Sequence, residues 1–344
     1  MLIVKSKLLI VKECGKLRRG AERVLSARQR STLMEGIQHK FVNVGDLKLH
    51  VADIGSGRNA VVFLHGFPEI WYSWRHQMIA LADVGFRAIS FDYRGYGLSD
   101  APPQPDKTTF SDLLNDLLAI LDALALPKVF LVGKDFGARP AYLFSILHPE
   151  RVLGVVTLGV PYVRPGPSVY HKLLPEGFYI LRWQEPGRAE ADFGRLDAKT
   201  VVRNIYILFS RSEIPIANEN QEIMDLVEPD TPLPSWFTEE DLATYGALYE
   251  KSGFQTALQV PYRSLGEVCN LPDPVVKVPA FLIMGGKDYV LKFPGIEDLT
   301  KGEKAKELVP NLEVTFIPEG THFVQEQFPE QVNQLILGFL AKHT

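Results

Sequence analysis

Short, continuous apolar runs that alternate with helical patterns restrict the possible folds of this chain. Four of them lie in its first half, at residues 60–64, 87–91, 128–133 and 152–159. Short continuous runs of this kind are typical of strands that are buried on both faces of a parallel sheet. Because strands that alternate with helices build a doubly wound sheet with right-handed crossovers, we predict an α/β fold.

Two local patterns fill in the first half of this sheet. Residues 39–55 alternate apolar and polar side chains around Gly45 and Asp46, which predicts an opening antiparallel hairpin. The clearest helix lies in TFSDLLNDLLAILDALAL, where leucines recur at helical spacing after Ser111, the predicted N-cap.

The alternation of strands and helices stops near residue 161 and resumes with the apolar runs in residues 278–288 and 312–322. Ligands bind at the carboxyl edge of open α/β sheets, so an inserted helical segment over that edge would close a pocket. The predicted division is a basic extension at 1–33, a core at 34–161 and 275–344, and a helical cap at 162–274.

Composition and charge argue against two classes of site. The 344 residues include only two cysteines, Cys14 and Cys269, without the spacing of a zinc site or a disulfide framework, so a reducing compartment fits. The formal charge of −4 conceals a charge of +7 on residues 1–33, which leaves −11 for the rest. A negatively charged body argues against a nucleic-acid partner.

Residues 1–33 differ in character from the rest of the chain. They are rich in Arg and Lys, but Glu13 and Glu22 do not suit a transit peptide, and their apolar runs are too short to span a membrane. Met34 begins a segment that reads as the start of a domain. We therefore expect an extension outside the fold and a cytoplasmic protein, with organelle import through residues 1–33 as the alternative.

The segment LVGKDFGARP places Asp135 between Gly133 and Gly137, after an apolar strand and before a helical pattern. This is the arrangement of a nucleophile elbow, in which small residues permit a sharp turn around the nucleophile. The central residue is usually serine, so an aspartate predicts a carboxylate nucleophile. The alternative is that Asp135 only caps the following helix.

Two residues that would complete a catalytic triad follow in the chain order nucleophile, acid, histidine. Asp288 ends the predicted strand AFLIMGGKD, and His322 follows the predicted strand LEVTFIPEG. Both thus lie at carboxyl ends of strands, as Asp135 does, and can converge with it on one site. The alternatives are a carboxylate that caps the next turn for Asp288 and a surface histidine for His322.

An oxyanion loop is predicted upstream. The segment LHGFPE follows a strand, which is where this architecture places such a loop. We expect the backbone N–H groups of Phe67 and Phe136 to donate hydrogen bonds to a developing oxyanion.

The motifs HGFPE, DYRGYGLSD, VGKDFGA, GGKDYV and GTHFVQEQFP occur in an order and spacing that resemble the epoxide hydrolases of the α/β-hydrolase fold, most closely the plant soluble enzymes. The resemblance runs from about Met34 to the C-terminus. It implies an α/β-hydrolase fold with an eight-stranded, mostly parallel sheet and an inserted helical cap. It also implies two cap tyrosines that activate the epoxide oxygen, for which Tyr179 and Tyr262 match. From the residues alone, either could be a packing tyrosine.

Three positions depart from the family pattern. Lys134 stands where the plant enzymes usually have His, Phe136 where they usually have Trp, and Pro261 replaces a more usual aromatic residue. Phe136 keeps the backbone N–H that an oxyanion hole needs. Lys134 puts a cation beside the nucleophile, where it would either lower the pKa of the carboxyl group or form an ion pair.

The chemistry that the resemblance implies explains the carboxylate. An epoxide carbon is saturated, so ring opening is a displacement, and a carboxylate is already ionised at neutral pH. Asp135 would open the ring to form an ester, with Tyr179 and Tyr262 protonating the departing oxygen. His322, oriented by Asp288, would then activate the water that hydrolyses the ester. Such a reaction requires no cofactor and no metal.

The expected substrate is a small hydrophobic epoxide, such as a fatty-acid or aromatic epoxide, in a pocket to which we assign Pro68 and Trp71. Water is the second reactant, no membrane span is expected, and a homodimer is the candidate assembly.

Two other functions stay open on the sequence. A haloalkane or haloacid dehalogenase shares the aspartate and the histidine but needs halide donors in the pocket, commonly Trp or Asn. This chain lacks a Trp directly after the nucleophile and has paired tyrosines. A non-catalytic ligand receptor is the second alternative, because a fold does not fix a function.

Overall fold

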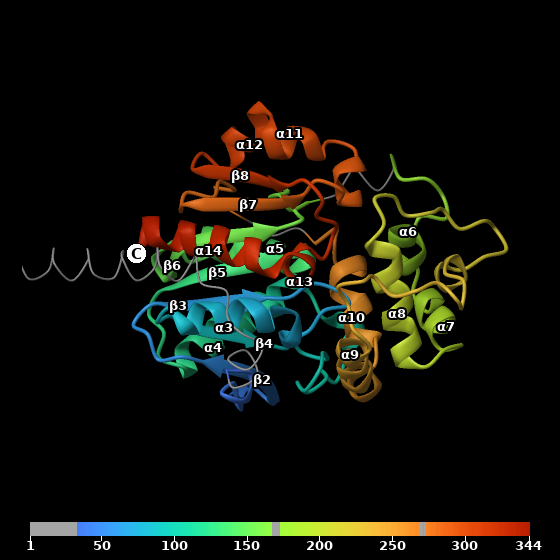
Figure 1. Ribbon diagram of the computed structural model, residues 1–344, viewed down its shortest axis with the longest axis horizontal. Helices are drawn as coiled ribbons and strands as arrows, with labels where there is room; N and C mark the ends of the chain where they lie inside the picture. The colour runs from blue at the N-terminus through green and yellow to red at the C-terminus, as the bar shows by residue number, and fades with distance from the viewer. Residues whose placement is uncertain (1–32, 167–172, 268–270, 272) are drawn as a thin grey trace, which may run out of the picture.

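The structure of the protein is a computed structural model that describes residues 33–166, 173–267, 271 and 273–344. The predicted basic extension at 1–33 lies outside these residues, apart from Leu33. In the described part, eight strands form one sheet with helices on both faces (Figure 1). None of the helices in the described part combines the length and the apolar character that crossing a membrane needs.

The sheet has the spatial order β1-β2-β4-β3-β5-β6-β7-β8. Its strands are β1 (Gln38–Val44), β2 (Leu47–Ile54), β3 (Ala60–Leu64), β4 (Arg87–Phe91), β5 (Val129–Lys134), β6 (Val152–Leu158), β7 (Ala280–Gly285) and β8 (Leu312–Ile317). The pairs β1–β2 and β2–β4 are antiparallel, and every other pair is parallel. The predictions of an opening hairpin and an eight-stranded, mostly parallel sheet are confirmed.

Two layers of helices explain why the central strands are continuously apolar. Helices α3 (Arg75–Asp83) and α14 (Pro329–His343) cover one face, and α4 (Phe110–Ala123) and α5 (Ala138–Leu147) cover the other. Successive side chains of a strand point to opposite faces. In β5, Leu131 therefore packs on the α4–α5 side while Phe130 and Val132 pack on the α3–α14 side.

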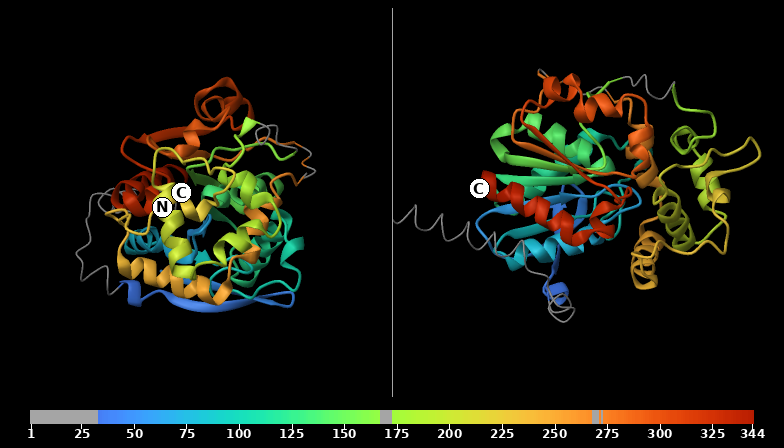
Figure 2. Two further views of the ribbon diagram at one scale, coloured as in Figure 1. Left: turned by 90° about the vertical axis from the view of Figure 1, so that its right-hand side faces the viewer. Right: turned by 45° about the horizontal axis from the view of Figure 1, so that its top comes forward.

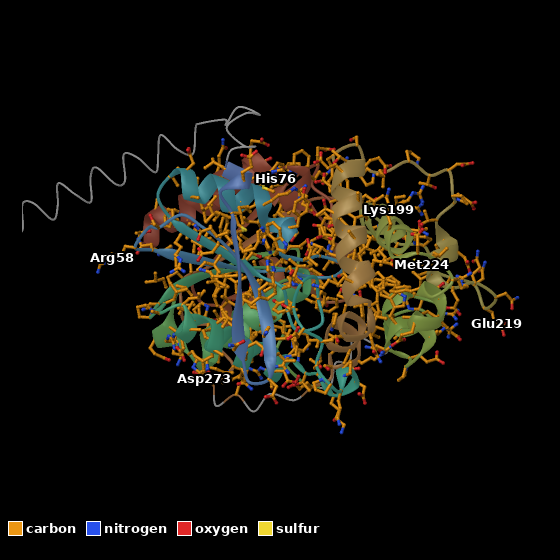
Figure 3. The ribbon with its side chains drawn as sticks, turned by 90° about the horizontal axis from the view of Figure 1, so that it is seen from below. Arg58, His76, Lys199, Glu219, Met224 and Asp273 are labelled. Carbon is orange, nitrogen blue, oxygen red and sulfur yellow. The ribbon has the colours of Figure 1, made fainter. Side chains whose placement is uncertain are left out.

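The helices between β6 and β7 gather beyond one end of the sheet (Figures 1 and 2). They are α6 (Tyr179–Gln184), α7 (Arg188–Phe193), α8 (Ala198–Phe209), η6 (Ile223–Leu226), α9 (Glu239–Ser252), α10 (Gln255–Leu258) and η7 (Gln259–Arg263). In Figure 3, Arg58, which precedes β3, lies at the opposite side of the molecule from Met224 and Glu219 of this helical segment. The cap thus lies over the carboxyl end of the sheet, while its limits at 162–274 stay a prediction.

Short elements complete the fold. They are η1 (Trp71–Trp74), η2 (Pro105–Lys107), η3 (Asp135–Gly137), η4 (Pro149–Arg151), η8 (Tyr289–Lys292), α11 (Ile296–Lys301), α12 (Glu303–Leu308) and α13 (Val324–Gln327). Three of them, η3, η8 and α13, follow the strands that end at the site described below.

The predicted N-cap of α4 is wrong. Thr109, not Ser111, precedes the first helical residue in an extended conformation, and it forms a capping box with Asp112. The Asp112 carboxylate accepts the Thr109 N–H at 2.9 Å, and the Thr109 hydroxyl accepts the Asp112 N–H. Ser111 lies inside the first turn, where its hydroxyl donates to Glu267.

This correction predicts a difference between two hydroxyl deletions. Thr109→Ala removes the cap of α4 and should lower the free energy of unfolding by about 1 kcal/mol. Ser111→Ala removes an exposed contact and should change it by less than about 0.5 kcal/mol. Urea unfolding followed by circular dichroism measures both values. A larger effect for Ser111→Ala would contradict the assigned cap.

Candidate active site

A sharp turn after β5 presents Asp135 at the carboxyl edge of the sheet. Asp135 has a φ of 51°, in the left-handed region that non-glycine residues rarely adopt. A Cβ at Gly133 would collide with the carbonyl oxygen of Gly137, and a Cβ at Gly137 would collide with those of Leu64 and His65. The two glycines therefore permit the close approach of β5, its turn and β3, as a nucleophile elbow requires.

Asp288 and His322 meet Asp135 at this edge. The Nδ1 atom of His322 lies 3.1 Å and 3.2 Å from the two carboxylate oxygens of Asp288. Its Nε2 atom lies 3.5 Å from Oδ1 of Asp135. His322 is fully buried, so the surface-histidine alternative is wrong. Asp288 also accepts the N–H of Val290 at 3.0 Å, so it caps η8 and contacts the imidazole at the same time.

The loop after β3 supplies a backbone donor to the same carboxylate. The N–H of Phe67 donates to Oδ2 of Asp135 at 3.1 Å. The N–H of Phe136 adjoins this carboxylate and helps to lower its pKa. At Gly66, a Cβ would lie 2.6 Å from the Asp135 side chain, so the loop can approach this closely only with glycine there. The two predicted oxyanion donors therefore both face Asp135.

The charges of the site favour an ionised aspartate. Burial alone would raise the pKa of Asp135, but the neighbouring imidazole of His322, the charge of Lys134 and the Phe136 N–H hold it below its ordinary value. The pKa of His322 is raised. Burial and the charge of Lys134 lower it, but the charge of Asp288, the neighbouring carboxylate of Asp135 and the hydrogen bond to Asp288 raise it by more.

The two predicted cap tyrosines lie above Asp135. Tyr179 belongs to α6 and Tyr262 to η7, and their ring centroids are 6.1 Å apart. The Tyr262 ring packs edge-on against Phe67 and Phe136, the two residues with the oxyanion N–H groups. Burial, with a contribution from the charge of Asp135, raises the pKa of both hydroxyls well above the ordinary value. Both tyrosines are therefore protonated at neutral pH.

The hydroxyls of these tyrosines have different partners. The Tyr179 hydroxyl lies 3.1 Å from that of Tyr289. Sequence reasoning did not select Tyr289, and its only signal is that it directly follows Asp288. The Tyr262 hydroxyl is buried and has no hydrogen-bond partner among the described residues. Because buried hydroxyls usually have a partner, the Tyr262 hydroxyl is an exception among the described residues.

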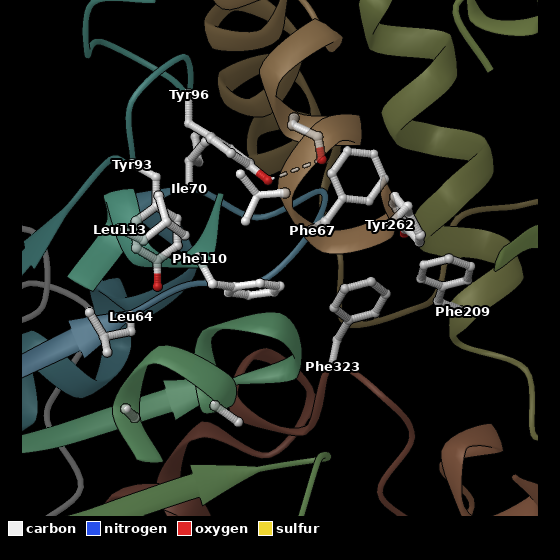
Figure 4. Close-up of a cluster of buried hydrophobic side chains, with 14 of the residues drawn as sticks. Leu64, Phe67, Ile70, Tyr93, Tyr96, Phe110, Leu113, Phe209, Tyr262 and Phe323 are labelled. Atoms are coloured by element: carbon white, nitrogen blue, oxygen red, sulfur yellow. Dashed lines mark hydrogen bonds between the residues drawn. The ribbon is translucent and has the colours of Figure 1, made fainter. Parts of the chain in front are cut away.

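A cavity of about 170 Å³ opens onto the nucleophile. Asp135, Phe136 and Tyr179 line it together with apolar side chains such as Leu174, Ile180, Val290 and Phe293. Figure 4 shows Phe67 and Tyr262 side by side between sheet and cap, with Phe209 and Phe323 nearby. A mostly apolar lining with a few polar groups is typical of a small-molecule site.

Pro68, Trp71 and Tyr262 are not among the residues that line this cavity, so the assignment of Pro68 and Trp71 to a substrate pocket stays a prediction. The Trp71 ring lies 4.8 Å from that of His39 and 6.0 Å from that of His50, on the strands of the opening hairpin. Trp71 is the first residue of η1, and its side chain belongs to the buried cluster on the α3–α14 side of the sheet.

Residues 322–327, here called the histidine segment, contact both the core and the cap through one buried acid. Glu326, in the short helix α13 after His322, contacts Arg75 of α3 at 2.5 Å. Its other carboxylate oxygen accepts the hydroxyls of Tyr206 from α8 at 2.9 Å and Tyr245 from α9 at 3.2 Å. Sequence reasoning missed this contact, because its partners lie far apart along the chain.

Comparison with known proteins matches this geometry. Residues 59–329 match the α/β-hydrolase-fold family. The chain is 39% identical to epoxide hydrolase 2 of Siraitia grosvenorii over 319 residues, which span 90% of this chain and 100% of that protein. This chain belongs to the epoxide hydrolases of the α/β-hydrolase fold.

Solved structures and a bacterial relative are similar to this chain over most of its length. An epoxide hydrolase of Vigna radiata superimposes with a TM-score of 0.83 at 36% identity, covering 90% of this chain and 99% of that one. Potato epoxide hydrolase I gives a TM-score of 0.82 at 35% identity, covering 89% and 99%. A bacterial member, epoxide hydrolase B of Mycobacterium tuberculosis, is 32% identical and covers 88% of this chain and 98% of its own.

The elbow predicts that this member of the family does not tolerate a side chain at residue 137. Gly137→Ala should lower the free energy of unfolding by about 2 kcal/mol or more, because a Cβ would force two stretches of backbone apart. Gly338→Ala is the matched control, since Gly338 lies exposed in α14 with no atom within 4 Å of an added Cβ. It should raise stability by about 0.5 kcal/mol. Urea unfolding of both variants checks this, and equal effects would contradict the described elbow.

Proposed function

We propose that this chain adds water to an epoxide to give a vicinal diol through a covalent ester on Asp135. One observation carries the proposal: the two oxygens of the Asp135 carboxylate have different surroundings. Oδ2 accepts the Phe67 N–H, while Oδ1 lies next to the His322 imidazole. A nucleophile that becomes an ester carbonyl needs this asymmetry, with one oxygen to attack and one to take up negative charge.

In the first step, Oδ1 of Asp135 attacks an epoxide carbon. A bond forms between Oδ1 and that carbon, and the bond from the carbon to the ring oxygen breaks. The ring oxygen, still attached through its other carbon, takes a proton from Tyr179 or Tyr262. Both hydroxyls hold their protons at neutral pH, because burial raises the pKa of each.

In the second step, His322 takes a proton from water, and the hydroxide attacks the ester carbonyl carbon. The oxyanion forms on Oδ2, where the N–H groups of Phe67 and Phe136 stabilise it. The bond from the carbonyl carbon to Oδ1 then breaks, and the diol oxygen leaves with a proton from His322. Asp288 keeps the imidazole oriented and stabilises its protonated form. The hydroxyl left on the Asp135 carbonyl gives up its proton, which restores the tyrosine.

The mostly apolar lining of the cavity supports a small hydrophobic epoxide, such as a fatty-acid or aromatic epoxide, as the substrate. Reducing conditions suit the two cysteines without a predicted pairing, so we place the reaction in the cytoplasm. A homodimer stays the proposed assembly.

One observation favours dehalogenation as a second candidate. Trp183 packs against Tyr179 and Tyr262, and its indole N–H has no hydrogen-bond acceptor among the described residues. An indole N–H of this kind can bind a departing halide. Release of halide from a haloalkane, without diol formation from epoxides, would support this candidate, and ligand binding without any turnover would support a receptor.

A single turnover in ¹⁸O-water tests the ester. With enzyme in excess over styrene oxide, the first diol should carry no label, because its new oxygen comes from Asp135, while the peptide that contains Asp135 gains one ¹⁸O. Mass spectrometry of diol and peptide measures both. Label in the first diol would show direct attack by water and overturn the proposal.

Two substitutions test which residue forms the ester and which residue hydrolyses it. Asp135→Ala should abolish turnover, and His322→Gln should let the ester accumulate, seen as an intact protein heavier by one epoxide. Asp273→Ala, at a surface site labelled in Figure 3, is the control and should turn over like the wild type. Ester on the Asp135→Ala protein would exclude Asp135 as the nucleophile.

The cap tyrosines give a further prediction. Tyr179→Phe and Tyr262→Phe should each slow ester formation by about 10²-fold, because each removes a proton donor to the ring oxygen. Tyr289→Phe is the matched control: it deletes the hydroxyl that contacts Tyr179 and should slow the step by less than about tenfold. Rapid-quench mass spectrometry measures the rates. An unchanged rate for both cap variants would remove the tyrosines from the mechanism.

A further inference from the structure

Lys134, directly before the nucleophile, is a buried cation that the steps above do not use. It is the last residue of β5, and its side chain is fully buried. Its Nζ lies 3.7 Å from Oε1 of Glu69 and 4.6 Å from the centre of the Phe323 ring. Nζ donates no hydrogen bond to any residue in the described part of the chain. Burial of an ammonium group without hydrogen bonds lowers the stability of the folded protein. We therefore expect the charge of Lys134 to have a function.

Glu69 is held firmly in its place beside Lys134. Its Oε2 accepts the Gly66 N–H at 2.8 Å, and its Oε1 accepts the side-chain amide of Gln325. Glu69 therefore fixes the position of the lysine without reaching it at hydrogen-bond distance. Phe323, which directly follows His322, offers the face of its ring as the second anchor.

Lys134 opposes the charges that favour a protonated His322. Asp135 and Asp288 face the imidazole from the elbow and from the end of β7, and both carboxylates favour its protonated form. Tyr289 of η8 also faces it, with ring centroids 4.9 Å apart, but is protonated because burial raises its pKa. After burial, the charge of Lys134 is the largest influence that lowers the pKa of His322.

The surroundings of Glu69 contain other titratable groups. The groups that interact with the Glu69 charge are His65, Tyr93, Tyr96, Tyr206, Tyr245, Tyr249 and Glu326. Burial raises the pKa of each of these tyrosines well above the ordinary value, so that they are neutral near pH 7. Burial lowers the pKa of His65, which favours its neutral form as well.

We propose that Lys134 is a positioning residue for ester hydrolysis: its charge, anchored by Glu69 and Phe323, opposes protonation of His322 and so helps the imidazole to accept a proton from water. The inference rests on the proposed function, because a neutral imidazole matters only if His322 activates water. The same charge helps to keep Asp135 ionised for the first step. A histidine at position 134, as the plant enzymes usually have, would change its charge over the same pH range as His322. The ammonium group of a lysine ordinarily does not.

Titration of the free protein tests the inference without any substrate. The ring signals of His322, assigned with His322→Gln, are followed by NMR against pH in four proteins: the wild type, Lys134→Met, Glu69→Gln and the double variant. Lys134→Met should raise the midpoint of His322 by about one pH unit, since a like charge is removed. The double variant leaves no buried charge of this pair without its partner, so it should fold even if Lys134→Met does not. Its His322 midpoint should show most of the rise expected for Lys134→Met.

Glu69→Gln is the matched control, because it changes the partner and leaves the cation. Its His322 midpoint should not rise. In single turnovers, the acid limb of ester hydrolysis should move to higher pH with the midpoint in the Lys134 variants. At a pH one unit below the wild-type midpoint, their ester hydrolysis should be about tenfold slower than that of the wild type.

Two results would overturn the inference: a His322 midpoint in the double variant within about 0.3 units of the wild type, or an equal rise in Glu69→Gln. Failure of the proposed function looks different. If the wild type forms no ester with epoxides but the midpoint still rises in the Lys134 variants, the electrostatic role of Lys134 stands and the reaction assigned to the site does not.

Discussion

The site depends on the close approach of two stretches of backbone, the turn at Gly137 and the end of β3. Because no side chain fits between them, the loop after β3 can bring the Phe67 N–H to 3.1 Å from the Asp135 carboxylate. The same approach holds Asp135 in a left-handed conformation that exposes its side chain to the cavity. The donor that would stabilise an oxyanion is thus in place before any substrate binds, which is the condition for effective electrostatic catalysis.

Burial sets the opposite protonation states that the chemistry needs. It raises the pKa of the phenols Tyr179 and Tyr262, which therefore keep their protons. It would also raise the pKa of the Asp135 carboxyl group, but nearby positive charge and hydrogen bonds outweigh it. A protonated acid and an ionised nucleophile can therefore lie in one apolar cavity because specific contacts act on the carboxylate alone.

The sequence predicts best what depends on local pattern. The apolar runs gave the strands, and glycine spacing with chain order gave Asp135, Asp288 and His322 as candidates that the structure brings together. The directions of side chains at turns depend on tertiary packing, so the packing of Trp71 against His39 and the hydroxyl contact of Tyr289 were not predicted. The neighbours of Lys134 could not be predicted either, since Glu69 and Gln325 lie far from it and from each other in the sequence.

The contacts of Glu326 limit how the cap can be exchanged between relatives. A hybrid that receives the cap of another protein keeps Arg75 and Glu326, which belong to the core, but replaces Tyr206 and Tyr245, which complete their hydrogen bonds. A donor cap without hydroxyls at these two places would leave a buried carboxylate oxygen without a partner, four residues after His322. An exchange of the cap should therefore include the histidine segment, although the cap is a continuous insertion in the sequence.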